Sequence, residues 1–209
     1  ALAPLNCHDR SLCKRFLDGE IRGPVRAELN SEITYPLDNA NSAEALSLLR
    51  KLAPELIISV RYRCILKETA IEIPKAGVLN LHSGILPDYR GVMATFWAML
   101  QGETEIGTTL HWIVDSGIDT GPIIAINRQA TRPDASYLAN VISLYRSGCD
   151  AIAEAVSDIA ASNTLHAKKQ HGKGRYFRAP AAADLHSFER NRLVLFDGSE
   201  HLALASGAE

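Results

Sequence analysis

The chain has 209 residues, 46% of them hydrophobic, which suits a soluble core in one ordinary domain with or without a small appendage. Its formal net charge of −2 provides no general attraction to nucleic acid or to an anionic membrane surface. No apolar run approaches the roughly 20 residues of a membrane-spanning helix, and the first residues do not resemble a secretory signal. The four cysteines show no C-x-x-C spacing, which disfavours a zinc cage or a disulfide framework and favours a cytoplasmic location.

The sequence patterns that indicate secondary structure are weak before residue 40 and clearer after it. Residues 10–18 are compatible with a helix, and residues 19–24 with a turn. Asn41 and Glu44 then form a capping-box pattern, and leucines recur at near-helical spacing as far as residue 52. Because the residue before a proline disfavours helical geometry, this helix is predicted to end before Pro54.

An apolar run at Leu56–Val60 begins the predicted sheet, since such a run is typical of a buried parallel strand. A second strand over residues 77–81 ends at His82, and a turn-rich loop (83–91) and an apolar helix (92–101) follow it. Further strands are predicted at residues 108–114 and 122–126. This order predicts an α/β protein with an open, mostly parallel Rossmann-like sheet flanked by helices.

A long helix is predicted after the last strand, from an N-cap at Asp134 to about Ala161, with Gly148 as a weak point. The remainder mixes glycine, lysine and alanine with short apolar pieces. We therefore expect residues 1–165 to form the main domain and residues 166–209 to form a C-terminal extension packed on it. Residues 174–180 are expected to pack on the domain, with a contact to a ligand pocket as the alternative.

Polar side chains stand where the predicted strands end, which is where open α/β sheets bind ligands. Asn80 and His82 close one strand, and their side chains share one side because side chains alternate along a strand. Asp119 lies in the loop between two later strands. Each residue alone is more often structural, since asparagine and the Asp-Thr-Gly sequence both favour turns. Together they predict an amide, an imidazole and a carboxylate at one rim of the sheet.

Two segments carry a resemblance to a known family. Residues 80–91, Asn-Leu-His-Ser-Gly-Ile-Leu-Pro-Asp-Tyr-Arg-Gly, resemble the N-[LIF]-H-x-x-x-L-P-x-[YWF]-[RK]-G signature of the folate-dependent formyltransferases. Residues 111–124 look like the second signature of that family, with Asp119 at its aspartate. The family includes glycinamide ribonucleotide, methionyl-tRNA and sugar-nucleotide formyltransferases, and the resemblance covers about residues 30–130.

The resemblance implies a reaction that these three side chains suit. An amine would take the formyl group of 10-formyltetrahydrofolate, and the Asn80 amide and a protonated His82 would donate hydrogen bonds to the developing oxyanion. Asp119 would keep His82 charged and relay a proton to the leaving nitrogen. The resemblance implies no metal. Asn80, His82 and Asp119 are therefore the predicted catalytic residues.

A folate-binding segment is also implied by the resemblance. In the family, the folate ring lies against the backbone between the apolar strand and the Asn-x-His strand, and a later loop closes its other side. Cys64 is expected to serve there as a packing or backbone position rather than as a reactive thiol. By position, the predicted folate contacts are Arg63, Cys64, Ile65, Leu66, Ile71, Val114, Asp115 and Ile118.

The chain departs from the family pattern at both ends. No opening strand with a glycine-rich turn precedes Ala1, which we attribute to lost residues, with a real loss that abolishes activity as the alternative. About 50 residues follow the predicted long helix and the net charge is negative, so tRNA is disfavoured. The expected acceptor is a small amine, on a nucleotide-linked amino sugar or derived from an amino acid. Whether the chain forms a homodimer is left open.

Two other functions compete with formyl transfer. A 10-formyltetrahydrofolate hydrolase resembles the same trio and gives the formyl group to water, but such enzymes usually carry an additional N-terminal domain. A non-catalytic folate-binding relative is the other alternative, which the intact trio argues against.

Overall fold

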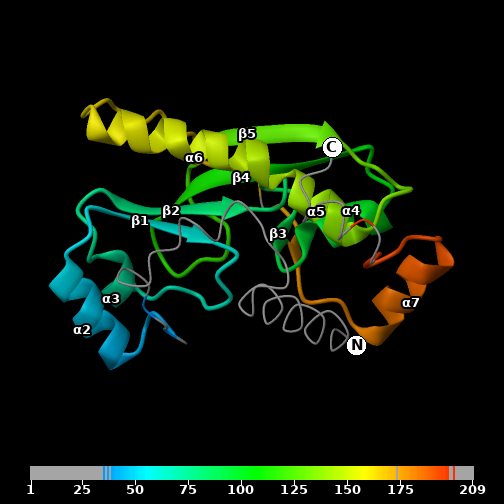
Figure 1. The fold of residues 1–209 in the computed structure, drawn as a ribbon, viewed down its shortest axis with the longest axis horizontal. Helices are drawn as coiled ribbons and strands as arrows, with labels where there is room; N and C mark the ends of the chain where they lie inside the picture. Colours follow the sequence, from blue (N-terminus) through cyan, green and yellow to red (C-terminus); the bar gives the residue numbers. More distant parts are fainter. Residues whose placement is uncertain (1–34, 36, 38, 173, 198–199, 201–209) are drawn as a thin grey trace. The chain divides into compact units, whose positions relative to one another are not determined.

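The computed structural model describes residues 35, 37, 39–172, 174–197 and 200 (Figure 1). The helix predicted at residues 10–18, the turn at 19–24 and the place of an opening strand lie outside the described residues. None of the helices in these described ranges combines the length and the hydrophobicity that a membrane span requires.

Helix α2 (Ala43–Leu52) begins and ends through its own backbone chemistry. The Ser42 side chain accepts a hydrogen bond from the Ala45 amide, so Ser42 is the N-cap, and the predicted capping box at Asn41 is wrong. Ala53 takes a left-handed conformation and ends the helix before Pro54. The Asn41 side chain instead binds the Ile65 carbonyl and the Lys67 amide, which fixes the segment after the first strand.

The main sheet of the described residues has the strand order β1-β2-β4-β5, from β1 (Leu56–Val60), β2 (Gly77–His82), β4 (Glu105–Ile113) and β5 (Ile123–Ala130). The predicted α/β class and open sheet flanked by helices are confirmed. The described strands form a mixed sheet: β1 and β2 are parallel, whereas β4 runs antiparallel to β2 and to β5. The loop at residues 114–122 joins β4 to β5 with no helix or strand between them, so these two strands form a hairpin and run in opposite directions.

Apolar side chains cover both faces of this sheet. On one face, Leu79, Leu81 and Leu110 pack with alanines of α6 (Tyr145–Ala160), and a Cβ atom at Gly148 would press on Leu81. Gly148 therefore lets α6 approach β2, although the sequence marks it as a weak point. On the other face, α2 and α3 (Glu68–Ile71) lie beneath β1 and β2 (Figure 1).

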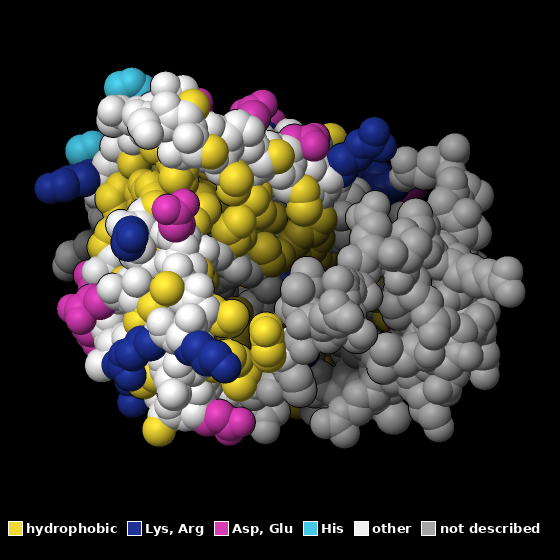
Figure 2. Space-filling view, turned by 60° about the vertical axis from the view of Figure 1, so that its left-hand side comes forward, with side chains coloured by type: hydrophobic (Ala, Val, Ile, Leu, Met, Phe, Trp, Pro, Cys, Tyr) yellow, Lys and Arg dark blue, Asp and Glu magenta, His cyan; other side chains and the backbone are white. Residues whose placement is uncertain are grey.

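β1 is the edge strand of the described sheet, and it carries exposed hydrophobic side chains. Ile58 is 40% exposed and Val60 is 41% exposed. Figure 2 shows hydrophobic side chains gathered on this side of the chain, with few charged groups among them. An exposed apolar edge of this kind is one to which a further strand can add.

The loop after β2 leads into helix α4 (Ala94–Leu100), which is almost wholly buried, lies within the predicted range 92–101 and is followed by Gly102 in a left-handed conformation. Within that loop, the two-residue strand β3 (Arg90–Gly91) pairs in parallel with β6 (Tyr176–Phe177) from the C-terminal part. This pairing brings residues 175–177 beside the loop that follows His82.

The predicted long helix is divided into α5 (Tyr137–Ser143) and α6, so the prediction of one helix from Asp134 to Ala161 is wrong. Ser136 rather than Asp134 caps α5, because its hydroxyl accepts a hydrogen bond from the Ala139 amide. The Ser143 hydroxyl donates to the Asn140 carbonyl, and the Leu144 amide bonds instead to the Val141 carbonyl. A serine side chain that competes for a helical carbonyl accounts for the break.

The described residues fall into two compact units. Residues 37–132 and 140–179 form the sheet unit, and residues 133–139 and 180–200 form the other. In this second unit, α7 (Ala182–Arg190) buries Leu185 and Phe188, and the Tyr137 amide donates to the Val194 carbonyl. Residues 166–179 thus belong with the sheet, while the packing of the rest of the predicted C-terminal extension stays a prediction.

Candidate functional site

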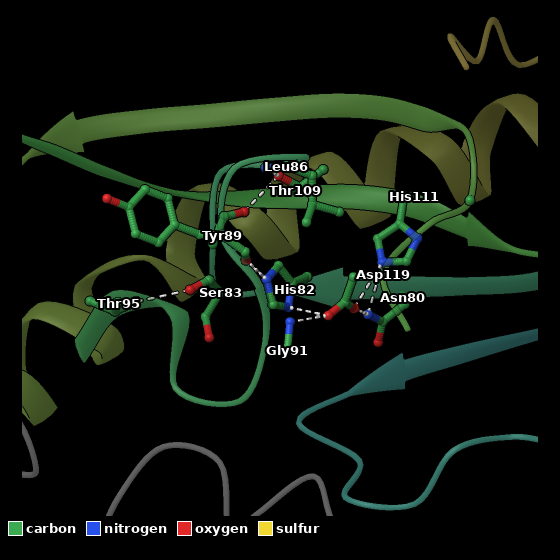
Figure 3. A network of polar contacts seen from close by, with 12 residues as sticks. Asn80, His82, Ser83, Leu86, Tyr89, Gly91, Thr95, Thr109, His111 and Asp119 are labelled. Atoms are coloured by element: carbon green, nitrogen blue, oxygen red, sulfur yellow. Dashed lines mark hydrogen bonds and ion pairs between the residues drawn. The ribbon is translucent and has the colours of Figure 1, made fainter. Parts of the chain in front are cut away.

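The structure brings the three predicted catalytic residues together within the sheet unit (Figure 3). Asn80 and His82 come from the end of β2 and point to the same side of the sheet. Asp119 comes from the turn between β4 and β5, where its φ of 52° is left-handed and presents the carboxylate to both of them. The predicted convergence of the trio is therefore observed.

The Asp119 carboxylate is the centre of this cluster, and its side chain is only 11% exposed. Oδ2 accepts a hydrogen bond from the Gly91 amide at 2.8 Å and lies 3.5 Å from His82 Nδ1. Oδ1 lies 3.5 Å from Asn80 Nδ2. Both carboxylate oxygens thus face donors or an imidazole, which fixes the position of the negative charge.

The turn that carries Asp119 is fastened by Gln170. Its side-chain amide donates to the Asp119 carbonyl at 2.9 Å and to the Gly121 carbonyl at 2.8 Å. Gly121 packs against the Trp112 carbonyl, where any Cβ atom would overlap. The Asp-Thr-Gly sequence is therefore both a tight turn and the support of a site residue.

The His82 ring is oriented by the loop that follows it. His82 Nε2 lies 2.6 Å from the Tyr89 carbonyl oxygen, which can only accept, so Nε2 carries a proton. The loop is held in turn by the Thr95 hydroxyl, which donates to the Ser83 carbonyl (Figure 3), and by the Thr109 hydroxyl, which donates to the Gly84 carbonyl. His82 Nδ1 is left facing Asp119.

The electrostatics of the pair differ from the charged imidazole that the sequence suggests. Burial lowers the pKa of His82 and outweighs the opposing charge of Asp119, so the resting imidazole is neutral. For Asp119, burial raises the pKa, but the neighbouring imidazoles of His111 and His82 and the hydrogen bond from the Gly91 amide together outweigh it and leave the pKa lowered. The site at rest therefore holds an ionised carboxylate beside a neutral imidazole whose Nδ1 has a free lone pair.

A fourth polar residue, His111, joins the cluster and is missing from the sequence-based site. It stands opposite Asn80 in the antiparallel pairing of β2 and β4, so both side chains lie on one face. His111 Nε2 lies 3.0 Å from Asn80 Nδ2 and 3.5 Å from Asp119 Oδ1. The alternation of β4 already sets His111 apart from Leu110, but only the strand register shows that it faces Asn80.

The predicted folate-contacting residues are more exposed than the trio. Ile65 and Val114 are 52% and 58% exposed, whereas Leu66 is buried and packs in the core with Ile71 beside it. The pKa of Glu68 is lowered by its own backbone amide and by Ser116, so the segment that follows residue 66 and the loop at residues 114–118 lie near each other. Arg63 and Asp115 are exposed, and Cys64 and Ile118 are half-buried. The described residues show no hydrogen bond from residues 63–66 to the trio.

The C-terminal stretch at residues 174–180 packs on the sheet unit as far as residue 179, as expected. Phe177 lies between the rings of Tyr89 and Trp97, with centroids 5.3 and 5.2 Å away. The Arg175 guanidinium lies 4.8 Å from the centroid of the Tyr89 ring, and Trp97 donates to the Arg178 carbonyl. This stack supports the Tyr89 carbonyl that orients His82.

Other surface features do not point to a separate site. The hollow lined by Arg50, Ala53, Thr69, Glu72 and Ile73 contains none of the trio. Among the described residues, no group of three or more histidine, cysteine, aspartate or glutamate side chains is arranged to hold a metal ion.

Comparison with known proteins gives a family match. The formyl transferase family model matches residues 23–137, more than half of the chain. The methionyl-tRNA formyltransferase of Geobacter sulfurreducens is 32% identical over 149 residues, which are 70% of this chain and 46% of that protein. The chain thus spans about half the length of the curated relatives that it matches.

Solved structures agree with this match. The formyltransferase PseJ from Anoxybacillus kamchatkensis, in complex with UDP-4,6-dideoxy-4-formamido-L-AltNAc and tetrahydrofolate, superposes with a TM-score of 0.54 at 27% identity. The match covers 69% of this chain and 71% of that one. A sugar N-formyltransferase from Shewanella has a TM-score of 0.59 at 17% identity, covers 73% of this chain and 65% of its own, and supports the fold alone.

Proposed function

The chain belongs to the formyl transferase family, and on that premise we propose that the protein transfers a formyl group from 10-formyltetrahydrofolate to an amine. The observation that carries this proposal is the convergence of Asn80, His82 and Asp119 at one end of β2. Their spacing matches what acyl transfer needs: a donor for a developing oxyanion, a base, and a carboxylate beside that base.

The proposed reaction follows from the protonation of the site. An Asn80 N–H donates to the formyl oxygen as negative charge develops, a contact typically worth about 3–4 kcal/mol. His82 Nδ1 accepts the proton that the attacking amine loses, and Asp119 stabilises the resulting imidazolium. The same proton passes to the leaving nitrogen, while a C–N bond to the amine forms and the original C–N bond breaks. In this account His82 acts first as a base, which revises the charged donor expected from the sequence.

We propose that the segment at residues 63–66 binds the folate donor. The folate carries the formyl group on a nitrogen that can act as the leaving group. Ile65 presents an apolar side chain to solvent, and Asn41 fixes the Ile65 carbonyl. The backbones of Cys64 and Leu66 form no hydrogen bond with the described residues, so they can bind the polar edge of a ring. Val114, Asp115 and Ile118 would face the other side of the ring, and Ile71 would form part of the wall.

For the acceptor, we propose the amine of a nucleotide-linked amino sugar. Support comes from PseJ, whose structure contains a formamido sugar nucleotide and tetrahydrofolate, and which is similar over most of this chain. An amine derived from an amino acid is the broader form of the same proposal. The protein is placed in the cytoplasm as part of this proposal, and Cys64 and Cys149 are both free thiols.

Methionyl-tRNA is the second candidate acceptor. Sequence relatives that match over about 150 residues include methionyl-tRNA formyltransferases, which opposes the expectation that tRNA is disfavoured. The net charge of −2 gives no general attraction to tRNA, and the chain spans less than half of these relatives.

An acceptor screen tests the proposal. The protein is incubated with 10-formyltetrahydrofolate and, in separate reactions, UDP- and dTDP-linked amino sugars, amino acids and methionyl-tRNA, and tetrahydrofolate and formate are both measured. Formyl transfer predicts tetrahydrofolate formation that depends on one amine, without equivalent formate. Formate released at the same rate with and without amines would identify a hydrolase instead. Folate binding without turnover would identify a non-catalytic relative.

A further inference from the structure

His111 is buried, with a side chain only 2% exposed, and both of its ring nitrogens have partners. Nδ1 lies 2.9 Å from the Trp112 carbonyl oxygen, and Nε2 lies 3.0 Å from Asn80 Nδ2. A residue of this kind on a β-strand is costly to bury unless its polar atoms are satisfied. Nothing in the proposed chemistry uses the ring directly.

The partners of His111 determine where its proton lies. A carbonyl oxygen only accepts hydrogen bonds, so Nδ1 must carry the proton that faces Trp112. In the neutral ring, Nε2 is then an acceptor with its lone pair directed at Asn80. In the opposite tautomer, the Nδ1 lone pair would face the Trp112 carbonyl oxygen, and the Nε2 proton would face the Asn80 N–H. Both contacts would then be repulsive.

This tautomer also decides how the Asn80 amide is turned. Two acceptors, His111 Nε2 and Asp119 Oδ1, converge on one end of that amide, at 3.0 and 3.5 Å. Only the NH₂ end satisfies both, because an oxygen there would face an ionised carboxylate and an imidazole lone pair. One N–H is held by His111, and the other has only the long contact to Asp119.

We propose that His111 is a positioning residue: as the Nδ1–H tautomer it holds the Asn80 amide so that its second N–H can donate to the formyl oxygen. This inference rests on the proposed formyl transfer and adds to it a residue that acts through Asn80 rather than on the substrate. The charged or titratable groups that face the ring are Asp119, from the β4–β5 turn, and His82, from β2. A Cβ atom added at Gly121 would overlap the Trp112 carbonyl and lie 3.5 Å from His111 Nδ1, so a glycine there leaves room for the contact between Nδ1 and that carbonyl.

The test compares two substitutions of similar size. His111→Leu fills the space and removes the acceptor, whereas His111→Gln can place a side-chain oxygen near the former Nε2. We expect H111L to lower kcat by about 10- to 100-fold, less than the loss of an oxyanion donor itself, with KM for the folate changed by less than about threefold. H111Q should restore kcat to within about threefold of the wild type. An H111L variant with more than half of the wild-type kcat, or an H111Q variant as slow as H111L, overturns the proposal.

A measurement that needs no turnover separates this inference from the proposed function. Two-bond ¹H–¹⁵N NMR of the imidazole assigns the tautomer of His111 in the unliganded wild-type protein near neutral pH. A proton on Nδ1 with Nε2 free supports the inference, and H111L should then shift the Asn80 side-chain amide signals while H111Q shifts them less. A proton on Nε2 overturns the inference. Because this result comes from the wild-type protein, it holds even if H111L does not fold. If the wild-type protein transfers no formyl group, the proposed function fails, and the NMR result still decides what His111 does.

Discussion

The cluster around Asp119 and the paired segments at residues 63–66 and 114–118 differ in how fully the fold satisfies their polar and apolar groups. In the cluster, the Asp119, His82 and His111 side chains are 11%, 8% and 2% exposed, and hydrogen bonds or close ion-pair contacts reach nearly every polar atom. In the paired segments, Ile65 and Val114 are more than half exposed. The difference indicates that the fold fixes the groups proposed to handle charge in advance and leaves exposed the segments proposed to bind the folate.

This contrast has a physical basis. Groups that stabilise a developing charge act best when they are fixed before the reaction, because they then need no rearrangement. A ligand surface gains affinity by burying exposed apolar area and pairing free backbone groups at the moment of binding. Changes in the cluster should therefore reduce kcat, and changes in the paired segments should raise KM.

Loss of the Asp119 charge should have the largest effect. Asp119→Asn keeps the shape of the side chain but removes the group that stabilises a protonated His82. We expect kcat to fall by about 10²-fold or more, with similar losses for Asn80→Ala and His82→Ala. Folate binding by D119N, measured by calorimetry with 5-formyltetrahydrofolate, should stay within about threefold of the wild type. Near-normal rates in all three variants would contradict the assigned roles.

A substitution that moves the backbone beside Asp119 should have a smaller effect. Gly91 has a φ of 98°, its amide holds Asp119, and a Cβ atom there would overlap the Phe177 carbonyl. Gly91→Ala should lower kcat about tenfold because small displacements of catalytic groups are costly. Gly102→Ala is the matched control, since its φ of 75° is also strained for alanine but no atom lies within 4 Å of the added Cβ. If G102A reduced kcat as much as G91A, strain rather than the contact with Asp119 would be responsible.

A charge placed in the paired segments should raise KM and spare kcat. Ile65→Asp puts a carboxylate where the folate ring is proposed to lie, and we expect KM for the folate to rise about 5- to 10-fold. Ile126→Asp is the control, because Ile126 is 36% exposed on β5 and outside both segments. Steady-state kinetics with varied folate distinguish the two. A fall in kcat without a change in KM for I65D would place the ligand elsewhere.

The smallest expected effect is on the pH dependence of stability. The pKa of His82 is lowered from its ordinary value of 6.5 in the folded protein, because burial disfavours the charged ring. Above pH 6.5 both folded and unfolded forms are neutral, and stability is complete. Below it the unfolded chain binds the proton first, so stability falls with pH until the folded pKa is reached.

Chemical denaturation between pH 7.5 and about 5 measures the contribution of His82 to the pH dependence of the free energy of unfolding. His82→Gln should flatten the fall in the free energy of unfolding just below pH 6.5. An identical slope in wild type and H82Q would mean that folding does not lower the pKa of His82, which would contradict a buried neutral ring.

How far the sequence predicts this molecule depends on the range of the interactions involved. The strand at Leu56–Val60 is found to the residue from its short, mostly apolar run, but its predicted burial is wrong, because Ile58 and Val60 are exposed on what is the edge strand of the described sheet. The caps at Asn41 and Asp134 are predicted one and two residues too early, because nearby Ser42 and Ser136 offer competing hydroxyls. The break at Leu144 depends on the rotamer of Ser143, which a helical pattern cannot reveal.

The site shows the same limit. Asn80, His82 and Asp119 stand in recognisable motifs, so their convergence could be expected. His111 and Gln170 reach the cluster through the β2–β4 register and through a contact 51 residues away along the chain. Such long-range partners carry no local signal, and the neutral state of His82 likewise depends on burial by the whole fold.

The most direct test of the central claim measures tetrahydrofolate formation by wild type and Asp119→Asn, at saturating 10-formyltetrahydrofolate, with and without the amine found in the acceptor screen. The account predicts that wild-type turnover depends on the amine and that D119N is slower by about 10²-fold or more while it still binds folate. Equal rates for the two proteins, or turnover that ignores the amine, would contradict it.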